Sequence, residues 1–349
     1  MKRDPSITTL ASLASKLELT EDEKHFDEQD QSVLPVKIPS SFFELIDPAD
    51  PHDPIRFQVV PTIYEHTEEK GETLDPLAEE KHAVTSRLIH RYANRVAFLT
   101  TDRCFIHCRH CFRRRFTGTF QGAATQEEVE EAAEYVGSHP EIKEILFTGG
   151  DLFTLSDDQL KTMIHAFRSK RPDLIIRLCT RAVAAQPERI TTELVEMIKS
   201  FTTAPFFLMT QFNHPRELTK EAVEAVARFI DNGIPAMNQS VLLKGVNDDA
   251  DTLEELCNTL LAHRIKPYYL FQGDLVSGTA HLRVSIEEGL KLEAELRRRL
   301  SGLAMPLYAL DLPEGGGKIP LVTSYVGEKE NGALIFRTPF DELRSYPAD

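Results

Sequence analysis

The 349-residue sequence is poor in cysteine and has no long apolar run. Three of its five cysteines lie within eight residues, so they do not form the spread framework of a disulfide-rich secreted protein. No apolar stretch approaches the ~18 residues needed to span a bilayer, and the N-terminal residues lack the apolar segment of a secretion signal. We therefore expect a cytoplasmic protein without a membrane partner, in which the clustered cysteines bind metal or take part in catalysis.

Basic residues are also scarce, with 40 lysines and arginines against 55 aspartates and glutamates and a formal net charge of −15. Proteins that bind nucleic acid present a basic face, so this balance argues against a nucleic-acid partner. A local basic pocket is compatible with it. The hydrophobic share is 41%, which is ordinary for a globule with a buried core, and the length suits two domains or one large α/β domain.

From about Arg95 onward, short apolar runs alternate with longer amphipathic stretches. The apolar runs are expected to form strands at Val96–Thr100, Glu144–Phe147, Leu174–Leu178, Pro205–Met209, Ala236–Leu242 and Pro267–Phe271. The stretches between them are expected to form helices at Gln126–Val136, Asp157–Arg168, Thr191–Phe201, Glu217–Asn232 and Asp251–His263. Six strands alternating with helices are typical of parallel βαβ units. Since a closed eight-stranded barrel needs two more units, the pattern predicts an α/β fold with a partial (β/α)6 barrel, a doubly wound sheet being the alternative.

The expected barrel core, residues 95–284, divides the chain into three parts. Residues 1–94 are acidic and punctuated by proline, and we expect a mainly helical N-terminal region with a short helix at Leu10–Leu17. Residues 285–349 form a short C-terminal segment, which begins with one more helix to about Leu300 and continues into a glycine-rich turn and a tail.

Cys104, Cys108 and Cys111 form a C-x3-C-x2-C cluster directly after the first expected strand. Active sites of such barrels lie at the carboxyl ends of the strands, where this loop falls. Three thiolates can hold three irons of a [4Fe–4S] cube, which leaves the fourth iron for a small chelating ligand. On this motif the sequence resembles the radical S-adenosylmethionine (SAM) superfamily, whose hallmark is this cysteine spacing.

Zinc is the alternative metal for this loop. A structural zinc site needs four ligands, and His107 and His110 are available beside the cysteines. Cys179 and Cys257 are isolated, however, and no second C-x2-C pair exists. The alternative of a different class is therefore a non-catalytic iron–sulfur or zinc protein that uses the loop as a structural staple.

Two further segments follow expected strands. Gly149, Gly150 and Asp151 resemble the glycine-rich segment that approaches the SAM methionine in this superfamily, since glycine lets backbone come close to a ligand. Asp151 is expected to cap the turn, and an ordinary strand-to-helix turn would look the same. Gln239, in the polar stretch Asn238–Asp248, is expected to contact a cofactor at the mouth of the site, a surface turn being the alternative.

The segment Gly315-Gly316-Gly317-Lys318 is the second unusual motif. It is not a Walker A loop, because Leu312 and Ile319 stand where that motif needs glycine and serine or threonine. Glycines beside one lysine suit a side chain that must move, as does a lysine that holds pyridoxal phosphate (PLP) and gives it up to substrate. A flexible turn without function is the alternative.

Together these motifs resemble the lysine 2,3-aminomutase family of radical SAM, PLP-dependent enzymes. The resemblance runs from about Pro54 to about Leu321. It implies three cofactors, which are a [4Fe–4S] cluster on the three cysteines, SAM and PLP. It also implies that Lys318 is the PLP lysine. Further PLP contacts are implied at Arg91, Tyr92 and Arg95, the arginines being suited to a phosphate.

The resemblance implies a substrate pocket as well. Arg113 matches the position that binds the substrate carboxylate, although without the resemblance Arg113 to Arg115 would be assigned to a solvated surface. Asp274 and Asp311 match two aspartates that bind the distal ammonium of lysine, where a glutamate-specific branch carries other residues. Two carboxylates in a partly buried pocket favour a cation and disfavour an acidic side chain. Taken alone, both aspartates would be assigned to turns or helix caps.

The implied activity is interconversion of L-α-lysine and β-lysine. A 5′-deoxyadenosyl radical takes hydrogen from the substrate, and the amino group migrates from C2 to C3. The alternatives are the same chemistry on arginine or ornithine, and supply of β-lysine for modification of elongation factor P. The expected partners are the amino-acid substrate and an electron donor such as a flavodoxin or ferredoxin.

One departure from the family concerns assembly. Its longer members bind structural zinc across subunits through cysteines in an extended C-terminal region. This sequence has no cysteine after Cys257, and Asp249 stands where the family has an additional cysteine. This departure leaves the assembly of the longer members without support in this sequence, while a homo-oligomer stays among the expected partners.

Overall fold

The computed structural model describes residues 6–119, 121–330 and 333–347. Within these ranges the centre is a nine-stranded sheet whose strands lie side by side in chain order. Its parallel strands are β2 (Arg95–Thr101), β3 (Glu144–Gly149), β4 (Ile175–Thr180), β5 (Phe206–Thr210), β6 (Ala236–Val241), β7 (Ile265–Phe271) and β8 (Leu307–Leu312). Antiparallel strands β1 (Leu88–Tyr92) and β9 (Gly317–Pro320) form the two edges.

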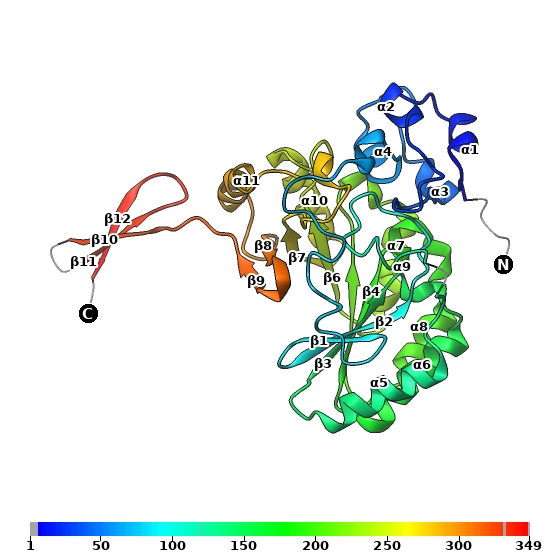
Figure 1. The fold of residues 1–349 in the computed structure, drawn as a ribbon. Helices are drawn as coiled ribbons and strands as arrows, with labels where there is room; N and C mark the ends of the chain where they lie inside the picture. Colours follow the sequence, from blue (N-terminus) through cyan, green and yellow to red (C-terminus); the bar gives the residue numbers. More distant parts are fainter. Residues whose placement is uncertain (1–5, 120, 331–332, 348–349) are drawn as a thin grey trace.

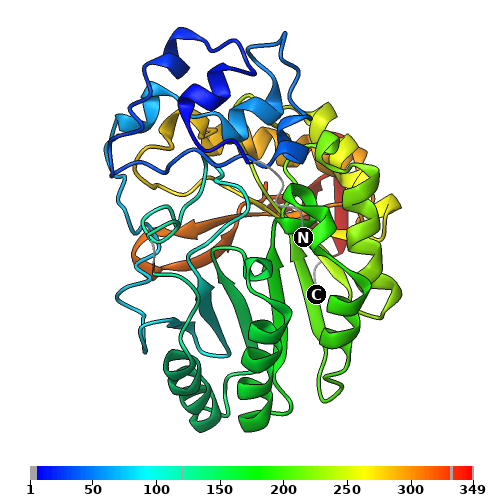
Figure 2. The ribbon, with the colours of Figure 1, turned by 90° about the vertical axis from the view of Figure 1, so that its right-hand side faces the viewer.

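Helices connect the parallel strands along the outer face of the sheet (Figures 1 and 2). The long ones are α5 (Gln126–Ser138), α6 (Asp157–Lys170), α8 (Thr192–Lys199), α9 (Lys220–Asp231), α10 (Ala250–Ala262) and α11 (Ile286–Arg299). A doubly wound sheet reverses its strand order at a switch point, whereas this order never reverses. Crossovers of one hand then place every helix on the same face. The predicted partial α/β barrel is therefore confirmed.

Side-chain caps determine where these helices begin. Thr125, Ser156 and Ser285 each accept a hydrogen bond from the backbone N–H three residues on, where a glutamate or glutamine returns one. The side chain of Thr219 caps α9 by accepting a hydrogen bond from the backbone N–H of Ala222. This helix therefore begins at Lys220 and not at Glu217, which lies in a separate 3-10 turn.

The main hydrophobic core lies between the sheet and these helices. Phe98, Phe147 and Phe167 are fully buried there, with ring centroids 5.1–6.0 Å apart. Leu13 and Phe42 of the N-terminal region belong to the same core. Each such side chain stabilises the fold by roughly 1.5–3 kcal/mol through burial, so the N-terminal region is held firmly against the barrel.

The N-terminal region consists of short helices joined by extended segments. The helices are α1 (Leu10–Ala14), α2 (Glu21–Lys24), α3 (Ser40–Phe43), α4 (Pro54–Val59) and the 3-10 turn η1 (Ile63–His66). The other short helices are α7 (Ala182–Ala185), η2 (Leu152–Thr154), η3 (Pro187–Arg189), η4 (Pro215–Glu217), η5 (Ala280–Leu282) and η6 (Pro313–Gly315). The sheet crosses both expected domain boundaries, because β1 and β8 lie outside residues 95–284; the three-part division stays a prediction.

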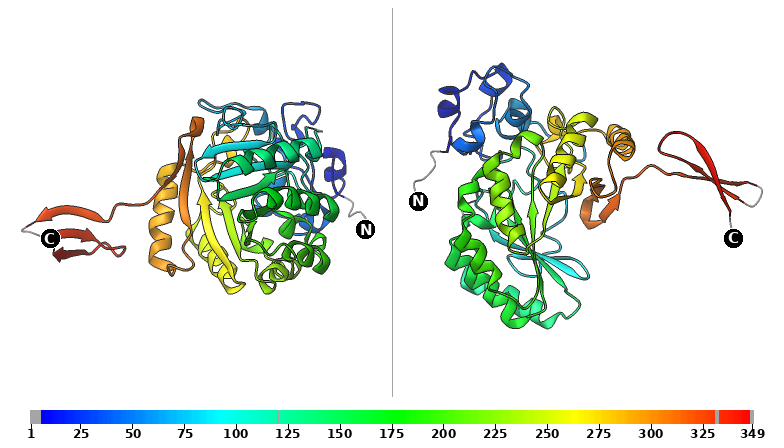
Figure 3. Two further views of the ribbon diagram at one scale, coloured as in Figure 1. Left: turned by 90° about the horizontal axis from the view of Figure 1, so that it is seen from below. Right: turned by 180° about the vertical axis from the view of Figure 1, so that it is seen from behind.

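The C-terminal segment differs from the expected turn and tail. It adds β8 to the parallel strands and continues into a separate antiparallel sheet of β10 (Val326–Glu330), β11 (Ala333–Arg337) and β12 (Leu343–Pro347). Figures 1 and 3 show this sheet projecting from the body of the molecule. Pro306 and Pro313 enclose the short run that forms β8, so periodicity alone does not identify it as a strand.

The sequence predicts no membrane-spanning segment, and the length and apolar character of the helices test this prediction. Of the helices in the described part of the chain, none combines the length and the apolar character that crossing a bilayer requires.

Candidate active site

The cysteine loop leaves the carboxyl end of β2 and carries three part-exposed thiols, those of Cys104, Cys108 and Cys111. The backbone N–H of Cys111 donates to the carbonyl of Cys108 at 3.0 Å, which closes the second half of the loop as a turn. Burial raises the pKa of the Cys104 thiol well above its usual value, and the neighbouring Cys111 adds to the rise. Ionisation of the Cys104 thiol therefore costs free energy in the absence of a bound cation.

The N-terminal region holds this loop in place. Lys37 Nζ donates to the carbonyl oxygen of Cys104 at 2.6 Å, and the carbonyl of Lys37 accepts from the N–H of His107 at 2.9 Å. The N–H of Arg109 donates to the carbonyl of Gln58 at 2.9 Å. The buried guanidinium of Arg109 pairs with the buried carboxylate of Glu65 at 2.6 Å. The region is thus part of the site's architecture.

Both histidines of the loop contact other groups. His107 Nδ1 lies 2.8 Å from the carbonyl oxygen of Pro35, and burial lowers its pKa to about 4. His110 Nε2 lies 3.0 Å from the amide nitrogen of Gln211. Among the described residues no three His, Cys, Asp or Glu side chains are arranged to hold a single metal ion. The thiolates of a [4Fe–4S] cluster bind different irons and need not converge on one point, so the loop suits a cluster better than zinc.

Gly149, Gly150 and Asp151 pack directly against the start of the cysteine loop. The N–H of Gly150 donates to the carbonyl of Thr101 at 2.6 Å, and that of Asp151 to the carbonyl of Arg103 at 2.7 Å. A Cβ on Gly150 would overlap the backbone of Arg103, so only glycine permits this approach. The predicted cap is present, since the Asp151 carboxylate accepts from the N–H of Phe153 at 3.0 Å.

Arg181 is a component of the site that the motifs did not identify. It directly follows β4, and its Nη1 donates to Cys108 Sγ at 2.7 Å. Its Nη2 donates to Gln58 Oε1 at 2.5 Å and to Glu217 Oε2 at 3.0 Å. The signal that could have found it is its position at the carboxyl end of a parallel strand, where site residues gather.

Lys318, Asp311 and Arg91 meet where the two edges of the open barrel face each other. Asp311 on β8 lies opposite Lys318 on β9, and the two side chains form an ion pair. Arg91 on β1 donates to the same carboxylate at 2.7 Å. Tyr92 hydroxyl lies 3.4 Å from it, and the guanidinium of Arg95 lies 3.8 Å from the centre of the Tyr92 ring. The structure thus brings together all four residues implied for PLP, around one aspartate.

Asp274 follows β7 and lies within electrostatic reach of this group. Burial raises the pKa of its carboxyl to about 7, and the nearby negative charge of Asp311 adds to the rise. Its carboxylate makes no hydrogen bond or ion pair with any described residue. The two aspartates singled out in the sequence therefore lie in one neighbourhood. Asp311 is paired with cations, whereas Asp274 forms no ion pair with a described residue.

Arg113 is not the solvated charge that its sequence alone suggested. Its Nε and Nη2 donate to the buried carboxylate of Glu79 at 2.7–3.0 Å, and its Nη1 donates to the hydroxyl of Thr148 at 2.8 Å. Arg114 pairs with buried Glu65, and Arg115 also reaches Glu79. These acidic partners lie 34–49 residues earlier in the chain, so no local pattern reveals them.

A small cavity lies between the cysteine loop and Asp274. It is lined by His110 of the cysteine loop, by Val241 and by Asp274, among others. Gln239 lies on the same face of β6 as Val241, since side chains alternate along a strand. Glu79, the partner of Arg113, is among the charges that raise the pKa of Asp274. The cysteine loop, Arg113 and the two aspartates therefore lie in one neighbourhood.

Comparison with known proteins identifies this architecture. The model of the Radical SAM superfamily matches residues 98–257, which contain all three cysteines and the glycine segment. The chain is 38% identical over 331 residues to L-lysine 2,3-aminomutase of Clostridium subterminale, covering 95% of this chain and 79% of that protein. It is 36% identical to L-lysine 2,3-aminomutase of Bacillus subtilis, covering 98% and 72%. It is also 36% identical to glutamate 2,3-aminomutase of Clostridioides difficile, covering 95% and 78%.

The protein is thus a radical SAM enzyme, and the superfamily implies a [4Fe–4S] cluster and SAM. Within that superfamily the chain belongs to the lysine 2,3-aminomutase family of aminomutases.

Proposed function

We propose that this aminomutase uses PLP and interconverts L-α-lysine and β-lysine. In this proposal Cys104, Cys108 and Cys111 bind the cluster, and Lys318 carries PLP. SAM lies against Gly149, Gly150, Asp151 and Gln239. When bound, the cluster and SAM supply the adenosyl radical that removes hydrogen, and PLP supplies the electron sink for migration of the amino group.

The cations near Lys318 support PLP as the third cofactor. Arg91, Arg95 and Lys318 all lie within 6 Å of the centre of the Tyr92 ring. The Nε of Arg91 is buried and has no hydrogen-bond partner among the described residues. A buried donor without a partner is unfavourable, and a phosphate oxygen is the kind of acceptor that satisfies a guanidinium. Arginines and an aromatic ring beside a lysine thus suit a phosphorylated cofactor.

The pairing of Asp274 with Asp311 is the observation that carries the substrate assignment. Without a ligand, the ammonium of Lys318 and the guanidinium of Arg91 both pair with Asp311. Engaging Lys318 with PLP removes that ammonium from Asp311, and the distal ammonium of a lysine substrate restores the lost charge. Asp274 then gains a cation as well, which favours its ionised form. A glutamate side chain would place a third carboxylate here, so the pocket disfavours it.

Arg113 is proposed to bind the opposite end of the substrate. Its guanidinium lies beside the cysteine loop, with its Nη1 on Thr148 at the end of β3. The fork of Nε and Nη2 is the group that matches a carboxylate, and Glu79 occupies it in the absence of ligand. A substrate carboxylate would share or replace that pairing. The distance between Arg113 and the aspartate pair would then set the length of the amino acid that fits.

We also propose an electron donor such as a flavodoxin or ferredoxin and a second copy of this chain as partners. The three part-exposed thiols support the first, because an electron must enter from outside. The projecting β10–β12 sheet supports the second, since Val326, Leu343 and Tyr346 are 58–66% exposed on it.

The experiment that tests this function is anaerobic reconstitution of the protein with iron and sulfide, followed by assay with L-lysine, SAM, PLP and dithionite. The expected product is β-lysine, and omission of any one cofactor should remove it. Bound PLP should give a visible imine band that borohydride abolishes. A colourless protein that holds zinc and lacks this band would instead support the alternative of a structural metal protein.

A further inference from the structure

The best-defined polar network of the site surrounds Arg181, whose side chain the proposed function leaves unassigned. Arg181 Nη1 donates to Cys108 Sγ at 2.7 Å, and the arginine is only 6% exposed. Among the described residues, this is the one hydrogen bond from a charged side chain to any of the three loop sulfurs. The next contact is the Thr117 hydroxyl, 3.8 Å from Cys111 Sγ.

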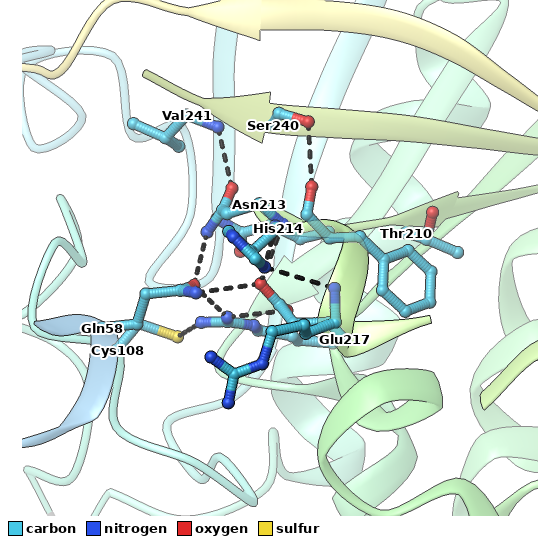
Figure 4. Close-up of polar contacts among 12 residues, drawn as sticks. Gln58, Cys108, Thr210, Asn213, His214, Glu217, Ser240 and Val241 are labelled. Carbon is cyan, nitrogen blue, oxygen red and sulfur yellow. Dashed lines mark hydrogen bonds and ion pairs between the residues drawn. The ribbon is translucent and has the colours of Figure 1, made fainter. Parts of the chain in front are cut away.

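The guanidinium of Arg181 is fixed from several sides. Glu217 is fully buried, and its Oε2 accepts from Arg181 Nη2 at 3.0 Å. The Oε1 of Glu217 accepts at 3.0 Å from Gln58 Nε2 and from the N–H groups of Asn213 and His214 (Figure 4). A carboxylate held by this many donors cannot follow the arginine if it moves. Glu217 therefore orients Arg181 toward the sulfur.

The backbone of Arg181 is fixed as well. Its N–H donates to Asp151 Oδ2 at 2.8 Å, and the Asp151 carboxylate also accepts from the hydroxyl of Thr180. Its guanidinium lies 5.2 Å from the centre of the Phe42 ring. The network thus joins the N-terminal region, the glycine segment and the cysteine loop at Cys108. An arginine needed only for packing would not require a buried carboxylate, here that of Glu217, to bind its guanidinium.

A fixed cation beside a cluster thiolate has a defined electrostatic consequence. On reduction, the cluster gains one electron and one unit of negative charge, while no atom is transferred and no bond breaks. A nearby positive charge and a hydrogen bond to sulfur stabilise the reduced form more than the oxidised form, which raises the reduction potential. The electron comes from the donor protein, or from dithionite in an assay.

We infer that Arg181 is a positioning residue that raises the reduction potential of the cluster by donating to Cys108, with Glu217 and Gln58 holding it in place. This inference rests on the proposed function, which places the cluster on the three cysteines. It adds a role for residues outside the cysteine motif, namely to make one-electron reduction of the cluster easier.

The test is an anaerobic redox titration followed by electron paramagnetic resonance on reconstituted wild type, Arg181→Met and Arg181→Lys. Arg189→Lys is the matched control, because Arg189 is 8% exposed and bonds the carbonyls of Phe153 and Leu155 instead of a sulfur. At the potential where half of the wild-type cluster is reduced, we expect the ratio of reduced to oxidised cluster in Arg181→Met to be about one tenth. This tenfold change in the ratio of reduced to oxidised cluster corresponds to about 59 mV for one electron. Arg181→Lys should fall between the two, and Arg189→Lys should match wild type.

Three outcomes overturn the inference in distinguishable ways. An unchanged midpoint in Arg181→Met would show that the contact does not affect the potential. Loss of the cluster from both Arg181 variants, with folded protein by circular dichroism, would make Arg181 a requirement for assembly and not a determinant of potential. A wild type without a [4Fe–4S] signal would overturn the proposed function itself, and this inference with it.

Discussion

The cysteine loop and the Lys318 group are adjacent parts of one site, but they are held in different ways. The loop lies over the continuous part of the sheet, and Lys37, Gln58 and Glu65 of the N-terminal region anchor it through backbone and buried contacts. The Lys318 group instead joins the two free edges of the barrel through ion pairs that converge on Asp311. Multiple short-range anchors suit a group that stays bound throughout the reaction. Ion pairs that share one carboxylate suit partners that exchange.

The backbone repeats this contrast. Gly150 lets its backbone pack against that of Arg103, at the start of the cysteine loop, more closely than any side chain would permit. Gly317, directly before Lys318, has a φ of +91°, a conformation that side chains other than glycine rarely adopt, and open space lies around most of it. Lys318 itself is 28% exposed on an edge strand. Glycine therefore serves close packing in one region and freedom of movement in the other.

The largest expected effect concerns the cysteine loop. Cys104→Ala, Cys108→Ala and Cys111→Ala should each abolish activity and remove most of the cluster iron, because each thiolate holds a different iron. Cys179→Ser and Cys257→Ser are the controls, since these cysteines lie on β4 and within α10. Anaerobic iron and sulfide analysis measures the effect. Full iron content in a variant lacking all three loop cysteines would end the cluster assignment.

Lys318→Ala should separate the two regions. The variant should keep the iron and sulfide of wild type but lose turnover and the visible PLP band, because the substitution alters the Lys318 group and leaves the cysteine loop intact. Peptide mapping after borohydride reduction of wild type should find the pyridoxyl label on Lys318. A label on Lys244, which lies in the polar stretch after β6, would contradict the assignment.

Substitution of the aspartates should have an intermediate effect. A hydrogen bond to a charged group contributes roughly 1.5–3 kcal/mol, so Asp274→Asn or Asp311→Asn should lower kcat/KM for lysine by about ten- to a hundredfold. The cluster signal and the PLP band should survive in Asp274→Asn, because Asp274 bonds none of the groups implied to hold either cofactor. Wild-type lysine kinetics in both variants would contradict the two-aspartate pocket.

A further effect is on stability, and it follows from the pKa of Asp274, which is raised from 3.8 to about 7. Well below pH 3.8 the carboxyl is protonated in the folded and unfolded chains, and the raised pKa costs nothing. As pH rises toward 7 the unfolded chain loses its proton first, and the folded state loses of the order of 2–4 kcal/mol. In ligand-free protein, Asp274→Asn should therefore raise Tm more at pH 8 than at pH 5.

The matched control for this measurement is Asp158→Asn, which replaces an exposed aspartate in the first turn of α6. Its small effect on Tm should be similar at the two pH values. An equal change for Asp274→Asn at pH 5 and pH 8 would show that Asp274 is not held in an unfavourable environment.

Much of the fold and the site could be predicted from the sequence. The β2 and β3 strands are runs such as Val96–Thr100 and Glu144–Phe147, whose apolar character and bounding turns are local signals. The cysteine spacing and the glycines beside Lys318 are local too. The family resemblance supplied Asp274 and Asp311, which carry no local signal of their own.

The rest depends on contacts between distant parts of the chain. Arg181 acquires its role from Cys108, 73 residues earlier, and from Glu217, 36 residues later. The partner of Arg113 is Glu79, in a segment with no regular helix or strand around it. β8 lies between Pro306 and Pro313, and its place beside β7 comes from strand pairing that periodicity does not encode. In each case the decisive property is proximity in the folded chain, which composition and spacing do not encode.

The central claim is that Asp274 and Asp311, beside Lys318, select a substrate with a distal cation. The most direct test is kcat/KM of reconstituted wild type for lysine, arginine, ornithine, glutamate and alanine. The account predicts that lysine is the best substrate, and that glutamate and alanine are at least about a hundredfold poorer because neither offers an ammonium to Asp274 and Asp311. Turnover of glutamate equal to that of lysine would contradict the account.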